Sequence, residues 1–188
     1  MGEREQYAPG PASGARVEKD GEKWTLVLMR ELRHPPQRVW EALTDPAHLA
    51  EWAPFDADRN LATAGPVKFT MARTPKPQVF DTAVQRAEAP RLLEYRWGEG
   101  ELRWELEPVG RGTRLTLWHN IDRRFIAWGA AGWHICLDVL DRLLEGKPIG
   151  RIVGNDAIPF GWQRLNAEYA QQFGIETPSW AGKQGQTS

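Results

Sequence analysis

The segment between residues 67 and 120 alternates apolar and polar side chains with a period of two, and this constrains the fold more than any other feature. It is clearest in ELRWELEPV, residues 101–109, where Leu102, Trp104 and Leu106 alternate with charged residues. Turn-forming segments (TPKP, APR, GEG and GRG) separate the runs. The other runs cover residues 67–72, 79–88, 92–97 and 113–120. Short strands at this spacing predict an antiparallel meander with one apolar face and one solvated face.

Helical patterns flank the meander on both sides. An apolar strand is expected at residues 24–32, and two short helices should follow it within 36–52, broken at Asp45-Pro46. After the meander, a long helix is predicted over 123–145 and a final helix closes at Gly174. A sheet curled around the long helix would bury both apolar surfaces together, which predicts an α+β fold.

The two ends of the chain differ in composition from its middle. Residues 1–22 are rich in Gly, Pro and charge without apolar periodicity, and 175–188 are similar. We therefore predict a flexible N-terminal arm (1–22), one domain (23–174) and a flexible tail (175–188).

Composition excludes several classes of function. A formal net charge of −1 disfavours nucleic-acid binding, and no run approaches the ~20 apolar residues of a membrane span. The single Cys cannot form an intramolecular disulfide, so a cytoplasmic protein is expected. The four His show no metal-ligand spacing, and phosphate-binding and dinucleotide-binding motifs are missing. We expect neither a metal nor a cofactor.

A family resemblance rests on RELRHPPQRVWEALTDPAHLAEW, residues 30–52. The residues that carry it are Arg30, Pro36, Val39, Trp40, Ala42, Thr44, Asp45, Pro46, Leu49 and Trp52. The segment resembles the opening of proteins similar to the activator of heat-shock-protein-90 ATPase, within the START/Bet v 1-like (SRPBCC, polyketide cyclase-like) superfamily. GWHICLDVLDRLLEGKP and LNAEYAQQFG resemble the closing elements of bacterial members, so the likeness covers about residues 22–174.

The resemblance implies a helix-grip fold, in which the curved sheet wraps around the long C-terminal helix and leaves a cavity between them. It implies no particular reaction, because the superfamily includes lipid and hormone carriers, cyclases and co-chaperone domains.

The long helix supplies several candidate cavity residues. At ~100° per residue, Phe125, Trp128, Gly129, Gly132 and Cys136 share the face expected to meet the sheet. His134 falls on the opposite face, where we expect it to meet water and pair with Asp138. Cys136 and His134 therefore form no catalytic pair. Cys136 is interpreted either as a small buried hydrophobe or as a thiol that lines the cavity beside the helix glycines.

The two helix glycines leave two interpretations open. A glycine inside a helix costs about 1 kcal/mol relative to alanine, so a compensating role is expected. Gly129 and Gly132 either allow close packing, or they leave room for a ligand or for a helix bend against the sheet.

The strands supply the remaining candidates. His119 shares the inward parity of Leu117, which makes it either a core histidine or a weak candidate for a catalytic base. The expected ligand cavity is lined by Phe69, Tyr95, Trp97, Trp104, Leu117, His119, Phe125, Trp128, Gly129, Gly132 and Cys136.

Three functions remain open. The first is binding of a small apolar or aromatic molecule in the cavity, without an assigned reaction. The second is a co-chaperone-like role with a chaperone partner, using the outer sheet face or an aromatic such as Trp118. The third is a cyclase or hydrolase that uses His119 and a water in the same cavity. The apolar loop 146–160 is interpreted as a cavity lid, a homodimer contact or a packed connection.

Overall fold

The computed structural model describes residues 2–176 and contains eight strands and four α-helices in that range. The strands are β1 (Ala15–Asp20), β2 (Lys23–Leu32), β3 (Phe55–Ala57), β4 (Gly65–Met71), β5 (Val79–Glu88), β6 (Leu92–Trp97), β7 (Gly100–Val109) and β8 (Gly112–Asn120). The α-helices are α1 (Pro36–Thr44), α2 (Pro46–Trp52), α3 (Ile126–Leu144) and α4 (Trp162–Phe173). Two 3₁₀ turns, η1 (Arg123–Phe125) and η2 (Gly154–Phe160), precede α3 and α4.

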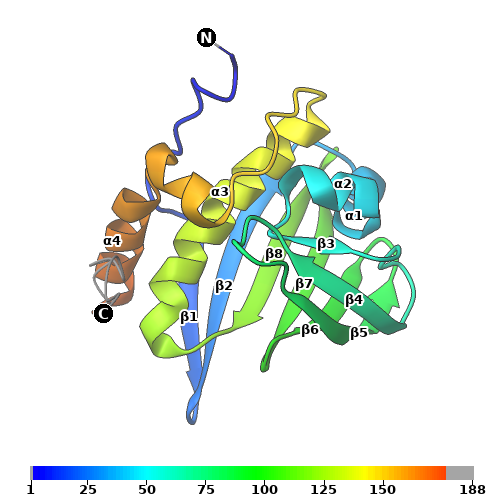
Figure 1. Ribbon diagram of the computed structural model, residues 1–188, viewed down its shortest axis with the longest axis horizontal. Coiled ribbons are helices and arrows are strands. Elements are labelled where there is room, and N and C mark those ends of the chain that lie inside the picture. Colours follow the sequence, from blue (N-terminus) through cyan, green and yellow to red (C-terminus); the bar gives the residue numbers. More distant parts are fainter. Residues whose placement is uncertain (1, 177–188) are drawn as a thin grey trace.

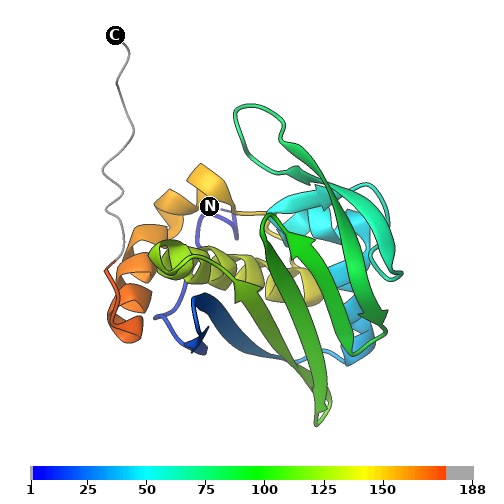
Figure 2. The same ribbon diagram turned by 90° about the horizontal axis from the view of Figure 1, so that it is seen from below.

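One curved antiparallel sheet holds all eight strands in the order β1-β2-β8-β7-β6-β5-β4-β3. Helix α3 crosses its concave face diagonally, and α1 and α2 cover the end near β3 (Figure 1). The view from below shows the sheet curling around α3 (Figure 2). This arrangement confirms the α+β fold that the patterns predicted and the helix-grip form that the resemblance implied.

The meander register shows why the alternating pattern predicted the sheet well. Leu102 pairs with His119, Trp104 with Leu117 and Leu106 with Leu115, and all six side chains are buried. In an antiparallel pair, directly opposed residues lie on the same face, so the pairing places the apolar positions of both strands in the core.

The short helices follow their sequence signals. The Asp45 carboxylate caps α2 by accepting a hydrogen bond from the Ala47 N–H at 2.8 Å, and Pro46 occupies the first turn. The indole N–H of Trp52 donates to the Ala42 carbonyl at 2.8 Å, which ties α2 to α1. Strand β3, with three residues, was not predicted, because so short a run carries no periodicity.

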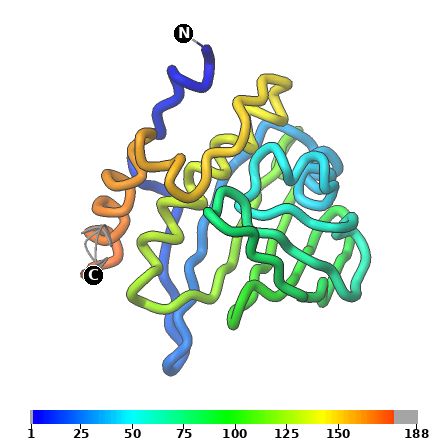
Figure 3. Tube along the Cα trace, in the orientation of Figure 1, coloured from blue at the N-terminus to red at the C-terminus, as the bar shows by residue number. Residues whose placement is uncertain are grey.

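The prediction of a free arm over residues 1–22 is wrong. Residues 15–20 form β1, an edge strand in which Ala15 pairs with Leu28, and the preceding segment packs against the helices. Tyr7 and Ala12 are buried there. The Cα trace shows this segment running beside α3 and α4 before it enters β1 (Figure 3). Composition missed it because a few anchoring side chains hold an otherwise polar stretch.

The prediction that His134 faces water is also wrong, since the residue is only 3% exposed. Helix α4 and the N-terminal segment cover the side of α3 that points away from the sheet (Figure 1). A helical wheel separates the two faces of a helix but does not reveal that a third layer covers the more polar one.

The predicted tail, residues 175–188, lies mostly outside the described residues; Ile175 packs against the core. Within residues 2–176, none of the helices has both the length and the apolar character needed to cross a membrane.

Candidate functional site: an apolar cavity beside α3

A cavity of ≈ 420 Å³ lies alongside α3. Its floor is the helix. Its outer wall belongs to residues 149–161, the larger part of the connection between α3 and α4, which we call the wall segment. The residues around it are Pro54, Trp97, Ile121, Phe125, Trp128, Gly129, Gly132, Trp133, Cys136, Ile152, Val153, Gly154, Asn155, Ala157, Ile158 and Trp162. A volume of this size suits a small organic ligand.

Aromatic rings form much of the cavity surface. The Trp128 ring meets Phe125 and Trp162 edge to face, with centroids 5.4 and 5.6 Å apart. The ring centroids of Trp97 and Trp133 lie 6.3 Å apart. Among the described lining residues none is Asp, Glu, Lys, Arg or His, so the site offers dispersion and ring contacts rather than charge.

The two helix glycines turn out to have different roles. A Cβ at Gly129 would lie 3.0 Å from the Ile121 side chain, so this glycine permits close packing. A Cβ at Gly132 would meet nothing nearer than the Trp162 indole nitrogen at 4.0 Å. Close contact therefore explains Gly129 but not Gly132, where the missing side chain leaves cavity space.

Cys136 lines the cavity with a side chain that is 4% exposed. Burial raises the pKa of its thiol to about 12, because the thiolate would lose its hydration. The group is therefore a neutral thiol at physiological pH and a poor nucleophile.

His119 does not line this cavity. It lies in the core beneath Trp133, whose indole N–H donates to His119 Nδ1 at 3.1 Å. Burial lowers the pKa of the imidazole to about 4, so the ring is neutral near pH 7. Its effect on the cavity is indirect, through the orientation of Trp133.

The structure brings together six of the predicted cavity residues: Trp97, Phe125, Trp128, Gly129, Gly132 and Cys136. Of the other five, Phe69, Tyr95, Trp104 and Leu117 lie in the solid core instead. His119 is buried as well, and it borders a separate pocket beside Trp24 and Trp97. In the core the Phe69 ring packs against Tyr95 at 5.3 Å, and the Trp104 indole N–H donates to the Tyr95 hydroxyl at 2.9 Å. Inward parity identified core positions correctly, but large aromatics fill that part of the concave face.

Sequence reasoning missed the outer wall of the cavity. Ile152, Val153 and Ile158 come from the wall segment, and Trp162 comes from the first turn of α4. The apolar content of loop 146–160 was the available signal. Among the three interpretations of this loop, its packing along the cavity fits the cavity lid.

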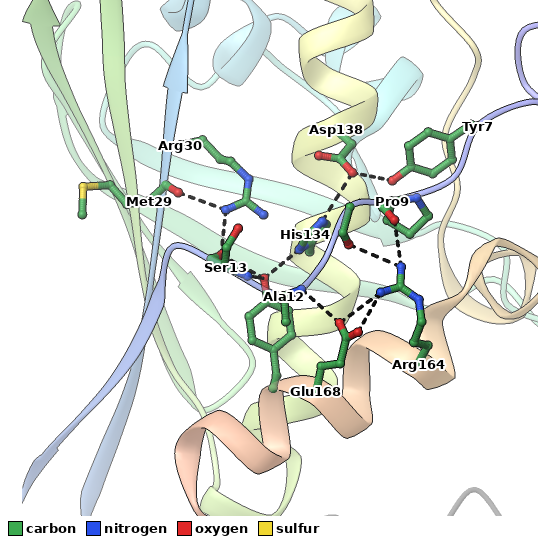
Figure 4. A network of polar contacts seen from close by, with 12 residues as sticks. Tyr7, Pro9, Ala12, Ser13, Met29, Arg30, His134, Asp138, Arg164 and Glu168 are labelled. Atoms are coloured by element: carbon green, nitrogen blue, oxygen red, sulfur yellow. Dashed lines mark hydrogen bonds and ion pairs between the residues drawn. The ribbon is translucent and has the colours of Figure 1, made fainter.

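A cluster of polar side chains lies on the side of α3 that faces away from the cavity (Figure 4). His134 Nδ1 lies 2.7 Å from the Tyr169 hydroxyl, and its Nε2 lies 3.5 Å from Asp138 Oδ2. The Tyr7 hydroxyl donates to the same Asp138 oxygen at 2.6 Å. Burial and the nearby Arg30 and Arg164 lower the pKa of His134 to about 4. These groups join three layers of the protein and lie outside the cavity lining.

Trp118, the aromatic residue named in the chaperone-partner hypothesis, is not fully exposed. It is half-buried on the outer sheet face, with the Arg103 and Arg16 guanidinium groups 4.6 and 5.3 Å from its ring centroid. In the described part of the chain, no cluster of three or more His, Cys, Asp or Glu side chains has the arrangement of a metal site.

Comparison with known proteins assigns the chain to one family. Residues 33–145 match the family model described as activator of Hsp90 ATPase homolog 1-like protein. The chain belongs to this family. The match spans α1 through the end of α3, and therefore includes the helix floor of the cavity but not the wall segment.

Solved structures support the fold. A conserved protein of unknown function from Enterococcus faecalis has TM-score 0.63 at 16% identity, covering 84% of this chain and 89% of the other. CalU16 from Micromonospora echinospora has TM-score 0.59 at 23% identity, covering 87% and 98%. An AHSA1-like protein from Aeromonas hydrophila has TM-score 0.55 at 20% identity, covering 65% and 92%. A search of curated proteins finds no match.

Proposed function

We propose that this protein binds a small, uncharged apolar or aromatic molecule in the cavity beside α3. Gly132 carries the proposal: a glycine in the middle of a 19-residue helix lowers helix stability, and its missing side chain faces cavity space. Four tryptophans around that space supply ring surfaces, and the uncharged lining disfavours ionic ligands.

The proposal assigns no reaction. A buried neutral thiol and a core histidine of lowered pKa are the chemically reactive groups nearest the cavity, and neither suits nucleophilic or base catalysis near pH 7. The cyclase or hydrolase alternative loses the base it relied on, because His119 is absent from the lining.

Binding of N-phenyl-1-naphthylamine, a neutral aromatic probe, tests the proposal. The wild-type protein should enhance the probe's fluorescence saturably and quench its own Trp emission. Gly132→Leu should weaken binding at least about tenfold, because the side chain fills the space that the probe needs.

Ala167→Leu is the matched control, since it places the same leucine side chain at an exposed position of α4. Equal probe affinity in wild type and Gly132→Leu, with both folded by circular dichroism, would contradict the proposal.

The chaperone-partner alternative is supported by family membership alone. Stimulation of the host chaperone's ATPase by both wild type and Gly132→Leu would favour it over ligand binding. If Gly132→Leu loses probe binding and neither protein affects the ATPase, ligand binding in the cavity is favoured.

A further inference from the structure

The wall segment contacts the first residues of the chain at both of its ends. At its start, Arg4 Nη1 lies 2.9, 2.8 and 3.1 Å from the carbonyl oxygens of Ile149, Gly150 and Arg151. At its end, the Phe160 ring lies 5.9 Å from the Tyr7 ring and 5.5 Å from the Arg4 guanidinium. The residues of the wall segment that line the cavity, Ile152 to Asn155 with Ala157 and Ile158, lie between these two contacts.

Residues 2–13, which we call the N-terminal strap, are themselves anchored to the body of the protein (Figure 4). The Tyr7 hydroxyl donates to Asp138 of α3 at 2.6 Å, and Arg164 of α4 donates to the Pro9 carbonyl at 2.8 Å. The Ala12 N–H donates to Glu168 at 3.0 Å. The strap therefore links the wall segment to α3 and α4, although none of its residues lines the cavity.

The wall segment also has contacts on its other side. At its start, Arg151 Nη2 donates to the Leu49 carbonyl at 3.0 Å and to Asp56 at 2.6 Å, and this side chain is only 9% exposed. Farther along the segment the contact is more exposed. The Arg73 guanidinium of the β4–β5 connection forms an ion pair with Asp156 at 3.3 Å, with both side chains more than 40% exposed. Exposed ion pairs of this kind contribute little. Hydrogen bonds from a charged guanidinium to partly buried carbonyls are stronger, and Tyr7 is buried.

We propose that the N-terminal strap is a clamp on the cavity wall that sets how fast a ligand enters and leaves. The inference rests on the proposed function, because it describes regulation of that same cavity. When Arg4 and Tyr7 are in place, residues 149–161 stay packed over the floor of α3. When they release, the wall segment opens more often, and both ligand entry and ligand exit become faster.

The test compares Arg4→Gln, Tyr7→Ala and the double variant with wild type in the full chain. Hydrogen exchange of peptides covering residues 149–161, without ligand, should accelerate at least about tenfold in the double variant, while β7 and β8 exchange as in wild type. Stopped-flow mixing with N-phenyl-1-naphthylamine should give association and dissociation rates that rise together, so that Kd changes less than about threefold.

Glu5→Gln is the matched control, because Glu5 accepts its hydrogen bond from Gly2 within the strap. It should leave both measurements unchanged. Should the double variant unfold, the single Arg4→Gln variant provides the same comparison.

The two proposals fail in different ways. If the wild type does not bind the probe but exchange at 149–161 accelerates, the ligand-binding proposal fails and the clamp on the wall segment stands. If exchange and probe kinetics match wild type in folded Arg4→Gln and double variants, the clamp is overturned.

Discussion

Two glycines of α3, three positions apart, show that the same amino acid can serve opposite purposes. Gly129 and Gly132 lie in one helix, yet one is required by a close side chain and the other leaves open space. The sequence predicted that both needed an explanation. Only the neighbours of each Cβ position distinguish the two explanations.

Gly132→Ala should raise the free energy of unfolding by about 1 kcal/mol, because alanine is the better helix former and its methyl group meets no atom closer than 4.0 Å. Urea denaturation measures the change. Gly129→Ala is the comparison: its methyl group would press on Ile121, so the gain should be smaller or reversed. A loss of stability in Gly132→Ala would show that the position is packed rather than open.

His119 makes stability depend on pH. Its pKa is lowered from 6.5 to about 4 in the folded protein. Below pH 6.5 the unfolded chain takes up a proton that the folded protein does not, so stability should fall as the pH drops from 6.5 towards 4. The full effect is on the order of 3 kcal/mol.

Chemical denaturation at a series of pH values measures this loss, and His134, whose pKa is lowered too, acts in the same direction. His119→Gln can still accept the Trp133 hydrogen bond and should show a smaller loss. Titration of the His119 ring by NMR with a midpoint near 6.5 in the folded protein would contradict the assignment.

At the scale of elements, α4 and the N-terminal strap determine what the far face of α3 meets. Tyr169 connects them: its ring is buried, and its hydroxyl donates to the Ser13 carbonyl at 3.1 Å and lies beside His134. The sequence predicted α3 and α4 as helices. It did not show that they pack side by side, because the polar residues between them are typical of a solvated surface.

Tyr169→Phe should lower the free energy of unfolding by about 1–3 kcal/mol, because it leaves a buried imidazole and a carbonyl without their partner. Urea denaturation gives the value, and Gln171→Ala on the exposed face of α4 is the control. A change below 0.5 kcal/mol would indicate that water replaces the hydroxyl.

At the scale of the whole molecule, eight strands wrap around α3 and a third layer closes its outer side (Figure 2). The concave face of the sheet is filled by aromatics such as Tyr95 and Trp104, so the free space lies to one side, between α3 and the wall segment. Family membership predicts the grip of sheet on helix. The position of the cavity depends on which side chains fill the space between the sheet and α3.

The sequence by itself determined β2, β4 to β8, the α-helices and the inward parity of the meander, because alternation and helical spacing are local properties that each segment carries alone. It also identified Phe125, Trp128, Gly129, Gly132 and Cys136 as cavity-lining residues, but it missed Trp133 on the same helix. Tertiary structure alone decided that His134 is buried, that Trp104 fills the core and that Ile152 and Trp162 complete the cavity. Those outcomes depend on contacts between residues distant in the chain, and no local period records which distant segment covers a given face.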